Sequence, residues 1–192
     1  MPETTNNIQI PYHMPDTREL FFFFISGVII SIPFTVFFSQ FTEVLCIQLD
    51  FMYATICSVA IFAPILEEFA KIYPILYRHG ETQRSLFTIA FLVGLGFGIA
   101  EFLLYVFVLD VPFIFRIPGL FFHAASTSII AYGIIIKKPY RFYILAVLLH
   151  FANNFFALFN EIWYVGGIAA LFLTYYLSWI YYSRTTMDPI DA

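Results

Sequence analysis

The sequence predicts an all-α, polytopic membrane protein, and its composition is the main reason. Of the 192 residues, 61% are hydrophobic and only 11% are charged, and the mean hydropathy is +0.84. A soluble domain carries roughly 25% charged residues. At roughly 20 residues per span, the chain has room for about six transmembrane helices joined by short loops. No separate soluble domain is expected.

Polar or proline-containing breaks divide the apolar sequence into its expected helices. We expect six of them, at about residues 20–38, 48–77, 85–109, 112–136, 141–159 and 162–182. Pro64 and Pro74 should kink or end the second, because proline lacks a backbone donor. Gly94, Gly96 and Gly98 should let the third helix pack closely on its neighbours. The helices form one transmembrane domain, 20–183, with polar tails at 1–19 and 184–192.

The distribution of basic residues predicts the orientation in the membrane. Of the nine lysines and arginines, all but Arg116 fall on one side of this topology, namely Arg18, Lys71, Arg78, Arg84, Lys137, Lys138, Arg141 and Arg184. The other side carries Glu43, Asp50, Asp110 and Glu161. Because basic residues favour the cytosolic side, both termini should be cytosolic, in the cell membrane. No basic patch suggests a nucleic-acid partner.

Two cysteines, Cys46 and Cys57, fall in or near the second expected helix. Eleven residues of helical rise would separate them by about 16 Å. We therefore expect no disulfide between them, and Cys57 should be a small buried hydrophobic residue. Two cysteines also give no cysteine zinc pattern.

Three charges interrupt the apolar run of the second helix. Glu67 and Glu68 precede Lys71 by four and three residues, so the lysine can reach either carboxylate. Charged residues inside a bilayer are usually functional. At 1.5 Å per residue from the cytosolic ends, Glu67 lies about 16 Å deep, His123 about 21 Å and His150 about 14 Å. These three side chains could therefore meet.

The remaining polar residues of the spans extend this cluster. Glu101 and Arg116 lie nearer the outer side, where they could form an ion pair or line one cavity. Glutamate with histidine is the combination that can take a proton from water and return it to a leaving amine. His150 and Asn154 lie one helical turn apart, a spacing that suits binding of an oxyanion.

The order of these motifs resembles that of PrsW-type intramembrane proteases. The motifs are Glu67-Glu68-Phe69-Ala70-Lys71, then Gly98-Ile99-Ala100-Glu101 with Tyr105, then Arg116 with His123, then His150-Phe151-Ala152-Asn153-Asn154. These proteases belong to the superfamily of CAAX prenyl proteases and bacteriocin-processing enzymes. The resemblance implies that Glu67 with His123 activates water and that His150 with Asn154 binds the oxyanion. Glu68, Lys71, Glu101 and Arg116 would then support the site.

The expected activity is cleavage of a membrane-protein or lipidated-peptide substrate by glutamate-activated water, in a cavity open to the cytosol. We expect no cofactor. A zinc site built from Glu67, Glu68, His123 and His150 is one alternative, because these are adequate zinc ligands. A proton-coupled transporter that uses the same residues as a relay is another. A scaffold that binds transmembrane segments is the third, since His and Asn also join helices in membranes. Oligomeric state is not readable from the sequence.

Overall fold

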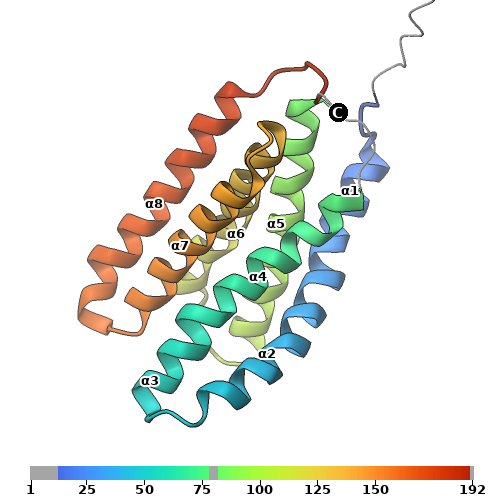
Figure 1. The fold of residues 1–192 in the computed structure, drawn as a ribbon. Helices are drawn as coiled ribbons and strands as arrows, with labels where there is room; N and C mark the ends of the chain where they lie inside the picture. The colour runs from blue at the N-terminus through green and yellow to red at the C-terminus, as the bar shows by residue number, and fades with distance from the viewer. Residues whose placement is uncertain (1–12, 78–81, 191–192) are drawn as a thin grey trace, which may run out of the picture.

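The computed structural model describes residues 13–77 and 82–190. Within them, the chain forms long helical rods packed side by side and no β-strand (Figure 1). The first rod comprises α1 (Thr17–Ser26), the π-helix η1 (Gly27–Ser31) and α2 (Ile32–Cys46). The second comprises α3 (Phe51–Thr55), the π-helix η2 (Ile56–Phe62), α4 (Ala63–Ile72) and the 3-10 helix η3 (Tyr73–Tyr77). The remaining helices are α5 (Gln83–Phe107), α6 (Phe113–Ile135), α7 (Pro139–Ala157) and α8 (Asn160–Arg184).

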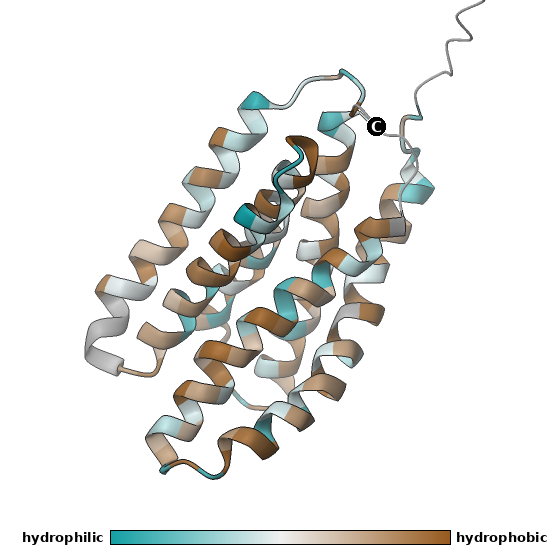
Figure 2. Ribbon diagram, viewed as in Figure 1, coloured by the Kyte–Doolittle hydropathy of each residue, from teal (hydrophilic) through white to brown (hydrophobic). Residues whose placement is uncertain are grey.

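Five helices of the described chain are long and apolar enough to cross a membrane. They cover Thr17–Cys46, Phe51–Leu76, Gln83–Phe107, Phe113–Ile135 and Val165–Arg184. The fifth predicted helix forms as α7 but is not among these candidates, because His150, Asn153 and Asn154 lower its hydropathy. The protein is therefore an integral membrane protein, and hydrophobic residues, in brown, recur along its helices between the ends (Figure 2).

The first rod extends beyond its predicted end at residue 38. The helix continues to Cys46 through Ser39, Thr42 and Glu43. Their spacing of three and four residues places them on one face of the helix. The predicted end was wrong, because these polar residues continue the helix and line a cavity that is described below.

Cys46 and Cys57 form a disulfide with a Cα–Cα distance of 5.8 Å, so the prediction of unbonded cysteines was wrong. The prediction assumed one straight helix between them. Instead, residues 47–50 reverse the chain, and η2 runs back alongside α2 (Figure 1). Cys46 ends α2 and Cys57 lies in η2, so the reversal brings the two thiols together.

The two prolines of the second rod lie where its helix type changes, as predicted. Pro64 occupies the first turn of α4, directly after the π-helix η2. Proline has no N–H to donate, and the hydrogen-bonding pattern changes from π-helical to α-helical at this position. Pro74 lies at the second position of η3, where the α-helical pattern has ended.

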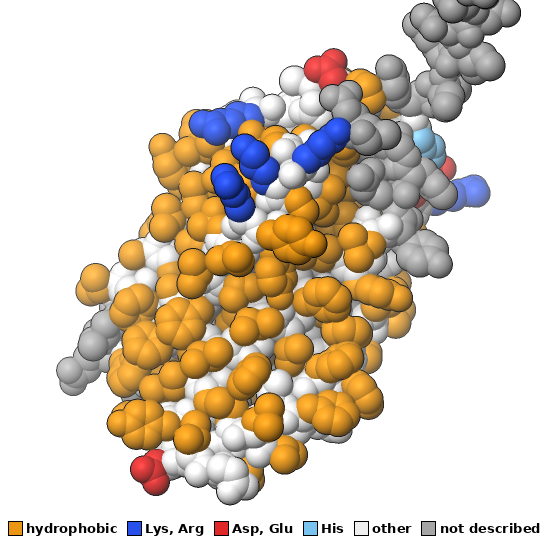
Figure 3. Space-filling model, viewed as in Figure 1, with side chains coloured by type: hydrophobic (Ala, Val, Ile, Leu, Met, Phe, Trp, Pro, Cys, Tyr) orange, Lys and Arg blue, Asp and Glu red, His pale blue; other side chains and the backbone are white. Residues whose placement is uncertain are grey.

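The two ends of the molecule carry charged side chains of opposite sign. Lys and Arg side chains gather at the end that holds the α6–α7 connection and the last turn of α8 (Figure 3). We call this the basic end. The opposite end holds the turn at Asp50 and the α5–α6 connection at Asp110, and we call it the acidic end. Arg78 and residues 1–12 of the N-terminal tail, which entered the orientation argument or the domain bounds, lie outside the described residues.

The half of the molecule near the basic end is filled by an apolar core. Buried residues of α5 and α6 pack there with Phe23 and Ile75; they include Leu86, Ile89, Val93, Ala131 and Ile135. The C-terminal segment adds backbone hydrogen bonds, from Gln83 to Asp188 and from Arg84 to Thr186. Apolar side chains therefore fill the interior of the bundle around these residues at the basic end.

Glycines bring the helices of this core into close contact, as predicted. A methyl group on Gly94 would lie 2.3 Å from the carbonyl oxygen of His123, and one on Gly98 would lie 2.4 Å from that of Leu120. A methyl group on Gly96 would similarly meet the carbonyl oxygen of Phe24. Helix α5 thus packs against the part of α6 that carries His123 at a distance that only glycine permits.

Candidate active site

Helix α4 presents its charged residues to the interior. Glu67, Glu68 and Lys71 are buried, whereas Ile65 and Phe69 on the opposite face are 38% and 47% exposed. The polar face of a membrane helix turns inward because hydrocarbon cannot solvate charges. The spacing of Glu67, Glu68 and Lys71 therefore fixes which face of α4 meets α6 and α7.

The best-protected group in the site is the Glu68–Lys71 ion pair. Lys71 Nζ donates to Glu68 Oε1 at 2.6 Å, and both side chains have 0% exposure. Ser126 Oγ on α6 donates to the same carboxylate oxygen at 3.1 Å. Buried charges persist only when paired and hydrogen-bonded, so this pair holds α4 and α6 in a fixed register.

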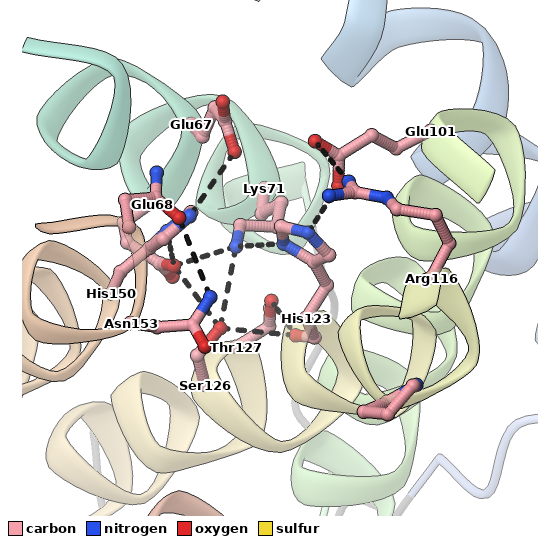
Figure 4. A network of polar contacts seen from close by, with 12 residues as sticks. Glu67, Glu68, Lys71, Glu101, Arg116, His123, Ser126, Thr127, His150 and Asn153 are labelled. Atoms are coloured by element: carbon pink, nitrogen blue, oxygen red, sulfur yellow. Dashed lines mark hydrogen bonds and ion pairs between the residues drawn. The ribbon is translucent and has the colours of Figure 1, made fainter. Parts of the chain in front are cut away.

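His150 on α7 completes the group around Glu68. Its Nδ1 lies 2.8 Å from Glu68 Oε1. A carboxylate paired with a lysine accepts hydrogen bonds only, so His150 Nδ1 donates. In the neutral ring, Nε2 then carries the free lone pair, and this atom lies 3.6 Å from Glu67 Oε2 (Figure 4).

His123 on α6 has the opposite tautomer. Lys71 Nζ lies 3.1 Å from His123 Nδ1, and an ammonium can only donate. Nδ1 therefore accepts, and Nε2 carries the proton that it donates to Glu101 Oε2 at 2.5 Å. Lys71 thus orients both histidines, one directly and one through Glu68.

Glu101 and Arg116 form the ion pair that the sequence suggested. Arg116 Nη2 lies 3.3 Å from Glu101 Oε1, and the guanidinium lies 3.6 Å from the ring centroid of Tyr105. Both charged residues line the same cavity. The two residues therefore form an ion pair and also line one cavity, which were the two alternatives from the sequence.

Among the described residues, Glu68 Oε2 and Glu67 Oε2 are buried carboxylate oxygens without a hydrogen-bond partner, and of the two residues it is Glu67 that lines the cavity. Its Oε2 is buried and has no hydrogen-bond partner in the described part of the chain. It faces the Nε2 lone pair of His150 across 3.6 Å. A proton donor or a cation that reaches both acceptors from the cavity would satisfy them.

A cavity of about 250 Å³ opens onto these groups. Its lining also includes one residue from each of four rods, near their ends, namely Glu43, Ser58, Tyr105 and Leu158. These residues lie towards the acidic end, and the apolar core closes the basic side. The expectation of a cavity open to the side of the basic residues was wrong, because depth along a helix does not say which end of the bundle is filled.

Asn154 lines the cavity but is partly engaged. Its Nδ2 donates to the backbone oxygen of Val59 at 3.1 Å, and its Oδ1 accepts from Asn153 at 3.4 Å. One amide hydrogen of Asn154 remains for a ligand. His150 and Asn154 share a helical face, as predicted.

Glu67, His123 and His150 can be tested as a metal site. Each offers one ligand atom, and these atoms lie within 4.8 Å of one another. Glu67 and His150 fit, because both turn unshared electron pairs towards the cavity and Glu68 holds His150 from behind, as carboxylates do in metal sites. His123 fits only if its proton moves to Nδ1, which faces the Lys71 ammonium. The predicted zinc set also included Glu68. Glu68 lies outside this group, because its Oε1 is hydrogen-bonded to Lys71, Ser126 and His150.

Several residues of the site were not anticipated. Ser126 supports Glu68, and Thr127 Oγ1 donates to the backbone of His123 at 2.8 Å. The sequence could have indicated them, because they follow His123 by three and four residues and so lie near its face of the helix. Ser39 and Thr42 add a wall from α2, where the predicted helix had already ended.

Comparison with known proteins agrees with this geometry. Residues 16–182 match the family described as PrsW family intramembrane metalloprotease. No curated protein and no solved structure matches the chain. The match spans all the helices that carry the site and covers most of the sequence. The chain therefore belongs to the PrsW family of intramembrane metalloproteases and is a membrane-embedded peptide hydrolase.

Proposed function

We propose that the protein cleaves a peptide bond of a membrane-protein or lipidated-peptide substrate with a water molecule held between Glu67 and His150. The supporting observation is the buried Glu67 Oε2, which has no partner in the described residues and lies 3.6 Å from His150 Nε2. Two acceptors that face each other are satisfied by one water with two hydrogens. Glu67 takes the proton as the water attacks, and no covalent enzyme intermediate forms.

His123 has the complementary role in this proposal. Its Nε2–H is donated to Glu101 in the free protein, and we propose that it turns to the carbonyl oxygen of the substrate when substrate binds. It stabilises the oxyanion together with the free amide hydrogen of Asn154, and Glu67, which took the proton of the water, returns that proton to the leaving amine. The family resemblance pairs Glu67 with His123 and His150 with Asn154. We exchange the two histidines because Lys71 and Glu68 impose opposite tautomers on them.

A metal-dependent form of the same reaction is the second candidate. It is favoured by the three ligand atoms within 4.8 Å and by the description of the family. Glu67, His150 and His123 would hold the metal, which when bound supplies a Lewis acid and an activated water. In this form His123 must give up its Nε2 proton, so Lys71 would have to accept a hydrogen bond from Nδ1.

We further propose that the basic end faces the cytosol, as the positive-inside rule predicts, in the cell membrane. The disulfide Cys46–Cys57 supports this orientation, because it lies towards the acidic end and disulfides persist in oxidising compartments. All six rods then cross the membrane, both termini are cytosolic and the cavity opens outward. The order of the four motifs also relates the chain to the CAAX prenyl protease superfamily.

The test is cleavage by purified protein in lipid nanodiscs. A panel of single-pass reporter proteins with labelled tails serves as probe, and products are identified by mass spectrometry. Glu67→Gln should lower the cleavage rate by at least about 10²-fold, whereas Asp50→Asn, an exposed carboxylate outside the cavity, should leave it unchanged. A transporter or a scaffold predicts no product, and full cleavage by Glu67→Gln would refute the assigned role.

A further inference from the structure

A second cavity lies on the far side of α6 from the active site. It is a groove of about 460 Å³ between α5, α6 and α8, within the size range of small-molecule sites. Its walls are mostly aromatic, and its lining comprises Phe87, Thr88, Phe91, Phe121, Ala125, Tyr175, Ser178, Trp179 and Tyr182. We call it the aromatic groove.

The aromatic groove is separate from the active site. Helix α6 turns Phe121 and Ala125 to the groove, whereas Phe122 and His123 line the catalytic cavity. A hydrogen bond between Ser128 and Ser178, 2.8 Å long, joins α6 to α8 beneath the groove. A ligand in the groove would therefore not contact Glu67 or His150.

The position of the groove along the helices matches one leaflet of a bilayer. On α8 it runs from Tyr175 to Tyr182, which lies two residues before the last helical residue, Arg184. This segment of α8 is about 10 Å long, whereas one leaflet of the hydrocarbon core is about 15 Å thick. On α5 it begins at Phe87, one turn after the helix starts at Gln83. The groove thus extends from the basic end towards the middle of the membrane.

A cation marks the basic end of the groove. The guanidinium of Arg84 lies 4.0 Å from the ring centroid of Tyr182, a groove residue. Arg84 Nη2 donates to the backbone oxygen of Thr185 at 2.5 Å, which fixes the side chain there. Its Nε is buried and has no hydrogen-bond partner among the described residues.

We propose that the aromatic groove binds one acyl chain of an anionic phospholipid, with the phosphate beside Arg84. Apolar walls, leaflet depth and a fixed cation at the headgroup level all fit such a lipid. A transmembrane helix fits less well, because helix–helix contacts use small residues, and the groove rim consists of Phe121, Trp179 and Tyr182 at 50%, 63% and 44% exposure. A slender chain can lie between such rings.

The experiment uses Trp179 as the reporter in the full-length chain. Trp163→Phe leaves Trp179 as the single tryptophan, since the chain has two. The protein is reconstituted in phosphatidylcholine vesicles that contain a minor fraction of lipid with brominated acyl chains, which quench tryptophan fluorescence on contact. Brominated phosphatidylglycerol should be enriched at Trp179 about fivefold over brominated phosphatidylcholine at the same fraction. Unlabelled phosphatidylglycerol should reverse the excess quenching, a result that needs no further variant.

Matched variants separate the chain and headgroup contributions. Ala125→Phe fills the groove and should abolish the excess quenching, whereas Leu173→Phe, on α8 outside the groove, should retain it. Arg84→Gln should remove the preference for phosphatidylglycerol, and Arg141→Gln, exposed at the same end, should not. Equal quenching by the two brominated lipids in the Trp163→Phe protein would overturn the proposal. So would excess quenching that unlabelled phosphatidylglycerol does not reverse.

Discussion

Replacing Lys71 with methionine would leave the Glu68 carboxylate buried without its cation. Both side chains have 0% exposure, and Nζ lies 2.6 Å from Oε1. Removing one partner of a buried ion pair costs about 3–5 kcal/mol, because the remaining charge is uncompensated. We therefore expect Lys71→Met and Glu68→Gln each to lower the free energy of unfolding by about that amount. Denaturant unfolding of the purified protein in detergent micelles measures this change.

The double variant tests the reasoning behind this number. Lys71→Met with Glu68→Gln removes both charges of this pair, so its loss should fall below the sum of the single losses by about 1–3 kcal/mol. Lys138→Met, an exposed lysine at the basic end, should change the stability by less than about 0.5 kcal/mol. Additive single losses would refute the claim that the two charges depend on each other.

Three other predictions concern the frame of the site and its use of metal. Cys46→Ser should lower the free energy of unfolding by about 2–3 kcal/mol, because the disulfide closes a short loop. A reducing agent should produce the same loss in the parent protein but none in Cys46→Ser. Gly94→Ala should destabilise the protein and impair cleavage, since its methyl group would lie 2.3 Å from the oxygen of His123; Gly119→Ala, with nothing within 4 Å, should fold normally in the same thermal unfolding assay. Dialysis against a strong chelator should leave reporter cleavage intact if water is held by Glu67 and His150 alone, whereas loss of cleavage that zinc restores would favour the metal-dependent form.

Much of the fold could be predicted because bilayer-spanning helices are constrained by hydropathy. The bounds of α5, α6, α7 and α8 lie within about two residues of those expected from apolar runs. The first rod was predicted too short, because Ser39, Thr42 and Glu43 have the polarity of a loop but face a cavity. The disulfide was missed for a related reason, since the turn at 47–50 contains no proline or glycine to signal a reversal.

The membership of the site could also be predicted, whereas its pairing could not. Charge inside an apolar helix and depth along it identified Glu67, His123 and His150, which the structure brings together. Which histidine faces which carboxylate depends on helix rotation and on hydrogen-bond direction. Lys71 sets the hydrogen-bond directions, because an ammonium can only donate. Its contacts with Glu68 and His123 are known only from the three-dimensional structure.

The measurement that tests the central claim most directly is a double-mutant cycle on the cleavage rate. Glu67→Gln, His150→Gln and the double variant are assayed on one cleaved reporter in single-turnover reactions. Residues that act as a unit show strongly non-additive losses. If Glu67 and His150 hold one water between them, the double variant should cleave no more slowly than the slower single variant. Losses that multiply in the double variant would contradict the account.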